Sequence, residues 1–186
     1  LSSVSIASNN STSTLAAVGN VVTLTFTASE TIATPVVTFQ SGSAAITDTS
    51  ITYASSGNVW TAAYTANASD TTGSVTYSIA FSDSAGNAGT AVTSGSGSVT
   101  FDKTAPTVSL VTTTADNQSS VSITDNITVT FSEAMEPSYI TADESTGCGA
   151  SIQVSSDNFS TCVMMSSDPV SSNSNRTFTL DPYDNL

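Results

Sequence analysis

Hydrophobic and polar residues alternate along much of the chain. Between residues 20 and 29, threonines separate four apolar side chains, those of Val22, Leu24, Phe26 and Ala28. Successive side chains of a strand point to opposite faces, so this period of two indicates a half-buried β-strand. The same alternation recurs at 58–66, 74–82 and 97–102. The pattern predicts strands along the first half of the chain, with almost no helix signal.

Clusters of Gly, Ser, Asn and Asp divide these stretches from one another, as turns do. The strands that we expect before residue 104 are 2–7, 20–29, 35–40, 50–54, 58–66, 74–82 and 97–102. Seven short strands in about 100 residues are typical of an immunoglobulin-like sandwich of two sheets. Its predicted core contains Phe26, Trp60, Tyr64, Tyr77, Ile79 and Phe81.

The pattern restarts after residue 102. Val4-Ser5-Ile6 corresponds to Val108-Ser109-Leu110, and the strand pattern at 23–26 recurs at 128–131, so the period is about 104 residues. This predicts an immunoglobulin-like β-sandwich at 1–103, a short linker at 104–107 stiffened by Pro106, and a second sandwich at 108–186. The predicted fold class is all-β, with two tandem immunoglobulin-like β-sandwiches.

The second sandwich is predicted to be incomplete at its C-terminus. Its expected strands are 107–111, 120–131, 150–154, 161–165 and 176–180, with Phe131 and Phe178 in the core. A count of seven would need two further strands after Tyr183. We expect them to come from later residues of a longer polypeptide or, alternatively, from another chain, because an open sheet edge invites strand pairing.

Charge excludes several classes of function. The chain has 2 Lys and Arg against 15 Asp and Glu, a formal net charge of −13, and no histidine. Nucleic acid is excluded as a partner because phosphate binding needs clustered cations. Imidazole-based catalysis is excluded as well. No apolar run approaches the roughly 18 residues of a membrane span, so none is expected in this segment.

Two family resemblances follow from particular motifs. Residues 1–107 resemble the bacterial immunoglobulin-like (Big) repeats of surface adhesins through Val-Thr-Leu-Thr-Phe-Thr-Ala-Ser-Glu at 22–30 and Val-Thr-Phe-Asp-Lys-Thr-Ala-Pro-Thr at 99–107. Residues 108–186 resemble the S-layer type (SbsA-like) through Ile-Thr-Val-Thr-Phe-Ser-Glu-Ala-Met at 127–135 and Thr-Phe-Thr-Leu-Asp-Pro-Tyr-Asp-Asn-Leu at 177–186. The resemblance implies an extracellular bacterial surface protein whose modules serve as spacers, adhesive tips or enzyme appendages.

Cys148 and Cys162 are the two cysteines of the chain. In an acidic chain of secreted character they suggest a disulfide across the second sandwich, with a pair of free buried thiols as the alternative. Zinc is not expected from two sulfurs without histidine.

Carboxylates are the remaining reactive groups. If strands alternate in direction, Glu30 neighbours Asp83 and Asn87 at one pole of the first domain. The same reasoning brings a second set toward the junction between the domains, namely Asp70, Asp102, Glu133 and Glu136. Both sets are candidate calcium sites, because calcium takes several oxygen ligands. Ordinary turn residues are the alternative.

Neither carboxylate set suggests an enzyme. Glu133 and Glu136 lie three residues apart on one expected loop, whereas glycoside hydrolysis needs carboxyls on both sides of the bond. We therefore expect a non-catalytic stalk or spacer of an exported bacterial protein, flanked by further immunoglobulin-like repeats or neighbouring protomers. The alternatives are a subunit of an extracellular filament completed by a neighbour's strand, and a calcium-dependent module that binds a glycan or a host or surface receptor.

Overall fold

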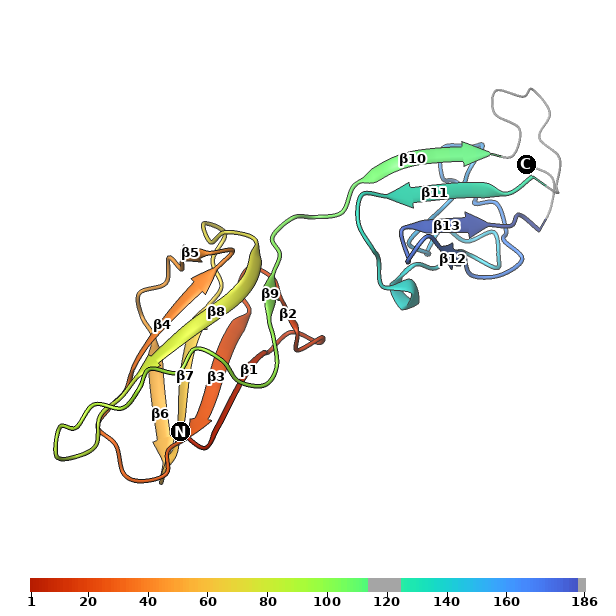
Figure 1. Ribbon diagram of the computed structural model, residues 1–186. Coiled ribbons are helices and arrows are strands. Elements are labelled where there is room, and N and C mark those ends of the chain that lie inside the picture. The colour runs from red at the N-terminus through yellow and green to blue at the C-terminus, as the bar shows by residue number, and fades with distance from the viewer. Residues whose placement is uncertain (114–124, 184–186) are drawn as a thin grey trace. The chain divides into compact units, whose positions relative to one another are not determined.

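The computed structural model describes residues 1–113 and 125–183. It divides into two compact units, unit 1 at Leu1–Thr104 and unit 2 at Ala105–Leu186 (Figure 1). Strands make up the regular structure of both units, apart from one short 3-10 helix in the described residues. The prediction of an all-β chain is confirmed.

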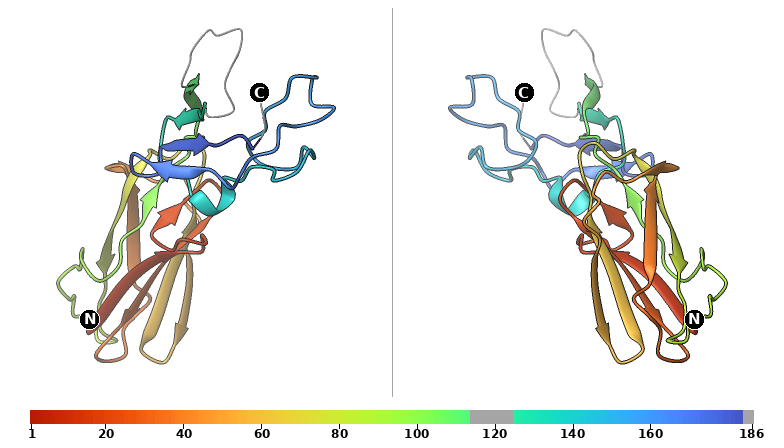
Figure 2. Two further views of the ribbon diagram at one scale, coloured as in Figure 1. Left: turned by 90° about the vertical axis from the view of Figure 1, so that its right-hand side faces the viewer. Right: turned by 90° about the vertical axis from the view of Figure 1, so that its left-hand side faces the viewer.

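Unit 1 is a sandwich of two sheets that face each other (Figures 1 and 2). The first sheet is antiparallel, in the order β1 (Ser3–Ser8), β3 (Val21–Thr27), β7 (Val59–Thr65), β6 (Thr52–Ser56). The second has the order β2 (Leu15–Ala16), β9 (Thr100–Phe101), β8 (Gly73–Ala80), β4 (Val36–Ser41), β5 (Ala44–Ala45). This strand order is that of an immunoglobulin-type sandwich.

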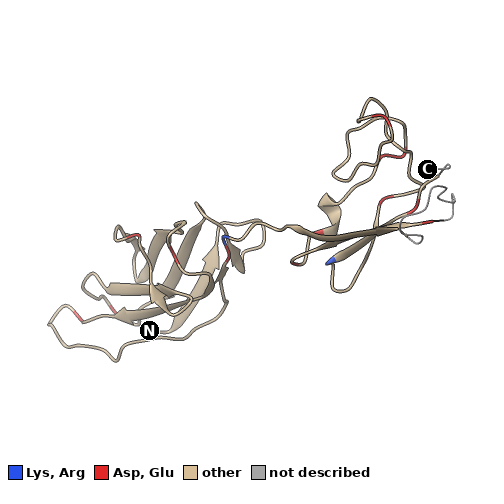
Figure 3. Ribbon diagram, turned by 90° about the horizontal axis from the view of Figure 1, so that it is seen from above, with Lys and Arg blue, Asp and Glu red and all other residues tan. Residues whose placement is uncertain are grey.

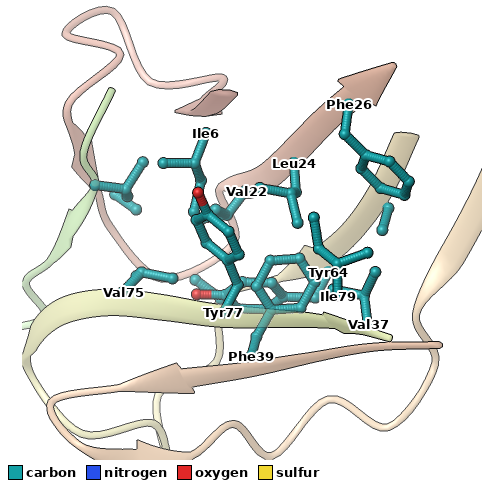
Figure 4. Close-up of a cluster of buried hydrophobic side chains, with 14 of the residues drawn as sticks. Ile6, Val22, Leu24, Phe26, Val37, Phe39, Tyr64, Val75, Tyr77 and Ile79 are labelled. Carbon is teal, nitrogen blue, oxygen red and sulfur yellow. The ribbon is translucent and has the colours of Figure 1, made fainter. Parts of the chain in front are cut away.

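The core of unit 1 lies between the two sheets (Figure 4). Alternation in β3 buries Val22, Leu24 and Phe26 completely while the intervening threonines are half-buried. The Phe39 and Tyr64 rings meet across the sandwich with their centroids 4.9 Å apart. Of the expected core residues, Phe26, Tyr64, Tyr77 and Ile79 are buried.

Trp60 and Phe81 differ from the expectation of full burial. Both are half-buried and pack against the margin of the core. Trp60 pairs with Phe26 near the end of β3, and Phe81 follows the last residue of β8. Each therefore lies close to one end of the sandwich, where no further strand residues cover it.

The expected strand at 97–102 is shorter than predicted, because the chain before it leaves β8. Val92 pairs with Ile79 of β8, whereas Ser96 pairs with Ser5 of β1 in the opposite sheet. The Ser96 amide donates to Val4 O at 2.8 Å, and the Ile6 amide donates to Ser96 O at 3.1 Å. The segment thus links the two sheets and closes one side of the sandwich.

Unit 2 contains one antiparallel sheet in its described residues, ordered β10 (Val108–Thr113), β11 (Ile127–Phe131), β13 (Thr177–Leu180), β12 (Val170–Ser172). Residues 132–169 cover one face of it (Figure 2) with irregular backbone and a 3-10 helix at Pro137–Tyr139. Of the expected strand at 120–131, residues 120–124 lie outside the described residues, and the observed strand begins at Ile127.

The strands expected at 150–154 and 161–165 are absent from the described structure of unit 2. Single backbone bonds hold these stretches, such as Val163 N to Val154 O at 2.8 Å. Asn158 and Phe159 between them adopt positive φ angles of 60° and 62°, which turns the chain instead of extending it. The apolar residues still point inward, because Ile152, Val154 and Val163 pack against the core of unit 2.

The core of unit 2 is smaller than that of unit 1. Phe178 is fully buried and meets Phe131 edge to face at 5.8 Å, although Phe131 itself is only half-buried. β10 is an edge strand, and its exposed fractions are 55% at Val108, 55% at Leu110 and 57% at Val111. Apolar side chains on β10 are therefore left open to solvent.

The Tyr64 hydroxyl generates the first prediction. It is buried without a hydrogen-bond partner among the described residues, and burial, reinforced by the negative charge of Asp70, raises the pKa of Tyr64 to about 12. In the unfolded chain the Tyr64 hydroxyl ionises near pH 10.0, whereas in the folded protein it keeps its proton up to a higher pH. The unfolded state is therefore favoured by deprotonation, and unit 1 loses stability as pH rises from 10 toward 12. Tyr64→Phe should leave stability at pH 7 unchanged or higher by about 1 kcal/mol.

The variant should also lose less stability than the parent protein above pH 10. Trp60, the single tryptophan, reports the unfolding of unit 1 by fluorescence in denaturant titrations at each pH. Tyr139→Phe, which changes a 75%-exposed tyrosine of unit 2, is the control. Identical pH dependence in the parent and Tyr64→Phe proteins would contradict the assignment.

Candidate functional site

One end of unit 1 is organised around the buried carboxylate of Asp70, which is 1% exposed. Its Oδ1 accepts hydrogen bonds from the Thr47 amide and the Thr47 hydroxyl, both at 2.7 Å, and its Oδ2 accepts one from the Asn67 amide at 2.9 Å. Asp70 therefore joins the loop after β5 to the turn between β7 and β8. This predicted calcium ligand already has three partners within its own unit.

Lys103 fixes the end of unit 1 to the same turn. Its Nζ donates to Asp70 O at 2.8 Å and to Ala68 O at 3.0 Å. Asp102, another predicted calcium ligand, accepts from the Thr104 amide at 2.9 Å, while its own amide donates to Ala16 O. The chain is thus tied to unit 1 as far as Thr104.

Glu133 and Glu136, the other two residues of this predicted calcium set, belong to unit 2. Oε1 of Glu133 is shielded from solvent and has no hydrogen-bond partner in the described chain, and Oε1 of Glu136 accepts from the Ser138 hydroxyl at 3.2 Å. Within residues 1–113 and 125–183, no three Cys, Asp or Glu side chains gather as an ion site would require. The junction calcium site stays a prediction.

At the other end of unit 1 the structure does bring the predicted residues together. Glu30, Asp83 and Asn87 line one pocket, between the loop after β3 and the segment after β8. The Asp83 carboxylate accepts from Asn87 Nδ2 at 2.7 Å, the Asn87 amide at 2.8 Å and the Ala85 amide at 2.9 Å. The Asn87 side chain, with these amides, lowers the pKa of Asp83. Asp83 thus remains an anion at all but strongly acidic pH.

Acidic side chains occur in both units, whereas each unit has a single cationic side chain, Lys103 in unit 1 and Arg176 in unit 2 (Figure 3). Both cations bind backbone carbonyls: Lys103 as described, and Arg176 through Nη1 to Ser132 O at 3.0 Å. Sequence reasoning missed these two anchoring roles. In the sequence, only the scarcity of Lys and Arg sets these two residues apart, and scarcity does not indicate which carbonyl groups they contact.

Cys148 and Cys162 form a disulfide in the structure, with a Cα–Cα distance of 5.4 Å. Cys162 is 5% exposed, and its amide donates to Thr146 O at 3.1 Å. The bond closes part of the irregular segment that covers the core of unit 2. No free cysteine remains.

Asp157 organises the turn inside the disulfide loop, a role that sequence reasoning also missed. The Thr161 hydroxyl donates to it at 2.7 Å, and the Ser155 hydroxyl donates at 2.8 Å. Led by the Thr161 side chain, these bonds lower the pKa of Asp157 to about 2. The spacing of Asp157 and Thr161 is the signal that could have indicated such a turn.

Comparison with known proteins agrees with this architecture. Residues 102–186, which include all of unit 2 and the last three residues of unit 1, match the family described as Bacterial Ig-like domain. The predicted bacterial immunoglobulin-like character of this part is confirmed, and such domains are non-catalytic. Searches of curated proteins and of solved structures found no match to the chain. In the described residues, no helix is long and apolar enough to span a membrane.

The hydrogen bonds of Asp70 generate the second prediction. Asp70→Asn replaces one carboxylate oxygen by a donor, which leaves an amide or hydroxyl of Thr47 or Asn67 without an acceptor. Unit 1 should lose about 1–3 kcal/mol of unfolding free energy, measured by Trp60 fluorescence in urea. Glu30→Gln makes the same charge change at an exposed residue and should alter stability by less than about 0.5 kcal/mol. Equal effects of the two variants would refute a structural role for the buried carboxylate.

The disulfide generates the third prediction. Its sequence separation is 14, and closing a loop of about 15 residues stabilises a fold by ~3 kcal/mol in the chain-entropy model. The double variant Cys148→Ala/Cys162→Ala should therefore exchange amide hydrogens faster throughout residues 125–183, measured by mass spectrometry, with unit 1 as the internal control. Two alkylatable thiols in the unreduced parent protein would show that the bond does not form.

Proposed function

We propose that the chain is a spacer segment in the stalk of an exported bacterial surface protein. The observation that carries this proposal is the division into two compact β units, each with its own hydrophobic core. A module that folds around its own core needs no ligand to be stable, and repetition of such modules adds length. The family of residues 102–186 supports the surface location, because bacterial Ig-like domains are typically found on extracellular proteins.

The surface chemistry supports the same role. Outward positions of β3 and β7 are occupied mainly by threonine. Proteases that cut after Lys or Arg have only two possible cleavage sites in the chain, after Lys103 and after Arg176. A stalk exposed to the medium benefits from such resistance.

The spacer role can be tested on cells. Residues 1–186 are placed between an outer-surface anchor and an epitope tag, and antibody binding to the tag is compared with a fusion that lacks them. The chain should increase antibody access several-fold, and mild trypsin should release the tag slowly. A fusion with an unstructured Ser/Thr-rich linker of equal length is the control. Antibody access equal to that of the fusion lacking the chain would overturn the proposal.

The filament alternative is favoured by one observation, the exposed apolar residues of edge strand β10. An open edge pairs readily with another strand. Sedimentation at increasing concentration separates the two functions, because a spacer stays monomeric. Assembly that Leu110→Lys abolishes would replace the spacer proposal by the filament.

A further inference from the structure

One edge of β8 is only partly paired with the chain that follows it. The Val75 amide donates to Val99 O at 2.8 Å, and the Ile79 amide donates to Val92 O at 2.9 Å. Alternate residues of an antiparallel strand direct their main-chain N–H and C=O groups to the same edge, so those of Tyr77 face this edge as well. No hydrogen bond joins either group to the segment between the two acceptor valines. The sheet therefore has a gap at Tyr77.

The gap exists because residues 93–98 leave β8 and approach β1. Ser96 makes the two backbone hydrogen bonds to β1 described above. Glycine is required for this close approach, because a Cβ at Gly95 would overlap Val4 O and the Tyr77 hydroxyl. The sequence therefore keeps this segment away from β8 along the length of the gap.

A pocket of about 400 Å³ lies beside the gap, on the outer face of the sheet that contains β4 and β8. Apart from Tyr77, its lining consists of uncharged polar side chains, those of Thr38, Gln40, Thr76, Ser78 and Thr93. None of these five side chains makes a hydrogen bond to another residue in the described part of the chain. The volume falls within the roughly 300–1,000 Å³ of small-molecule sites, and the polar groups remain available to a ligand.

A second pocket, of about 190 Å³, adjoins the first and shares Thr76, Tyr77 and Thr93 with it. Its apolar lining includes Ile6 and Val75, two buried residues of the core (Figure 4). Among the described residues that line either pocket, none is charged. The two pockets together combine hydroxyl groups, one unpaired stretch of main chain and a small apolar patch, which suits a neutral ligand.

We propose that these adjoining pockets bind an N-acetylated sugar. An acetamido group has a carbonyl acceptor and an N–H donor, which complement the N–H and C=O groups of Tyr77 as one peptide group complements another between paired strands. The acetyl methyl group contacts Ile6 and Val75 in the smaller pocket. The sugar hydroxyls bind the unpaired polar side chains of the larger pocket, since threonine hydroxyls and the Gln40 amide can both donate and accept.

The dimensions of the gap favour an acetamido group over a peptide strand. The chain meets β8 at Val75 and again at Ile79, which are four residues, or about 13 Å of strand, apart. A strand laid along this edge would collide with Val92 and Val99, whereas a short side group can enter between them. Sugar binding goes beyond the spacer role and does not depend on it, since both pockets lie within unit 1.

The test is a titration of the ¹⁵N-labelled chain with methyl N-acetyl-β-glucosaminide, followed by NMR. Saturable shifts are expected at the amides of residues 75–79 and 93–98. The Tyr77 amide hydrogen should exchange with solvent several-fold more slowly when the sugar is bound, because it gains an acceptor. Methyl β-glucoside, which lacks the acetamido group, should produce no saturable shifts. Equal binding of the glucoside, or no binding of either sugar, would overturn the proposal.

Thr93→Val removes an exposed hydroxyl that lines both pockets and should weaken binding about two- to ten-fold, the effect of one lost hydrogen bond. Thr25→Val is the matched control, because it makes the same change on the outward face of β3 and should leave the affinity unchanged. Equal affinities of the two variants would overturn the proposal. Equal binding of N-methylacetamide would show that the gap accepts any amide, and tighter binding of a neutral alanine peptide would assign it to peptides; either result would overturn sugar binding.

Discussion

The end of unit 1 at which β7 turns into β8 depends on the buried carboxylate of Asp70. A charge removed from water is stable only if hydrogen bonds replace its hydration, and Thr47 and Asn67 supply them. The main-chain oxygens of the same turn then bind Lys103. One turn therefore fixes the loop after β5, the loop between β7 and β8, and the segment that leaves unit 1.

Unit 2 differs from unit 1 because its described residues contain one sheet and not two. The apolar inner face of that sheet must therefore be covered by something other than a second sheet. Residues 132–169 cover this face but form few backbone hydrogen bonds of the kind that pair strands. Side-chain hydrogen bonds and the disulfide therefore hold this segment in place. Asp143 illustrates this, since its carboxylate accepts from the amides of Gly149 and Ala150 while its carbonyl accepts from Met165. Such a layer tolerates irregular backbone as long as its apolar residues point inward.

The period of two predicted the strands of unit 1 well because its threonines face outward and its large apolar residues inward. It could not predict the course of residues 92–98, because Val92 pairs with Ile79 of β8 whereas Ser96 pairs with Ser5 of β1, in the opposite sheet and far earlier in the chain. It also predicted strands at 150–154 and 161–165, where the apolar residues are indeed packed inward but the backbone forms only isolated contacts, such as the single bridge between Met165 and Pro182. Alternation reports which side chains are buried, and strand pairing requires a partner that the local pattern does not contain.

The two candidate sets of acidic residues show a similar limit of sequence-based prediction: the positions of the acids can be predicted, but their hydrogen bonds cannot. Loop order was sufficient to place Glu30 beside Asp83 and Asn87, because antiparallel strands bring alternate loops to one end. Loop order did not show that Thr47 and Asn67 would occupy the Asp70 oxygens, because that depends on where the loop after β5 folds back. The ends of unit 1 consequently differ: at one the Asp70 carboxylate is buried and hydrogen-bonded within the unit, and at the other the Glu30 side chain is exposed to solvent. The sequence locates the acids, and their hydrogen bonds decide which of them remain available for binding.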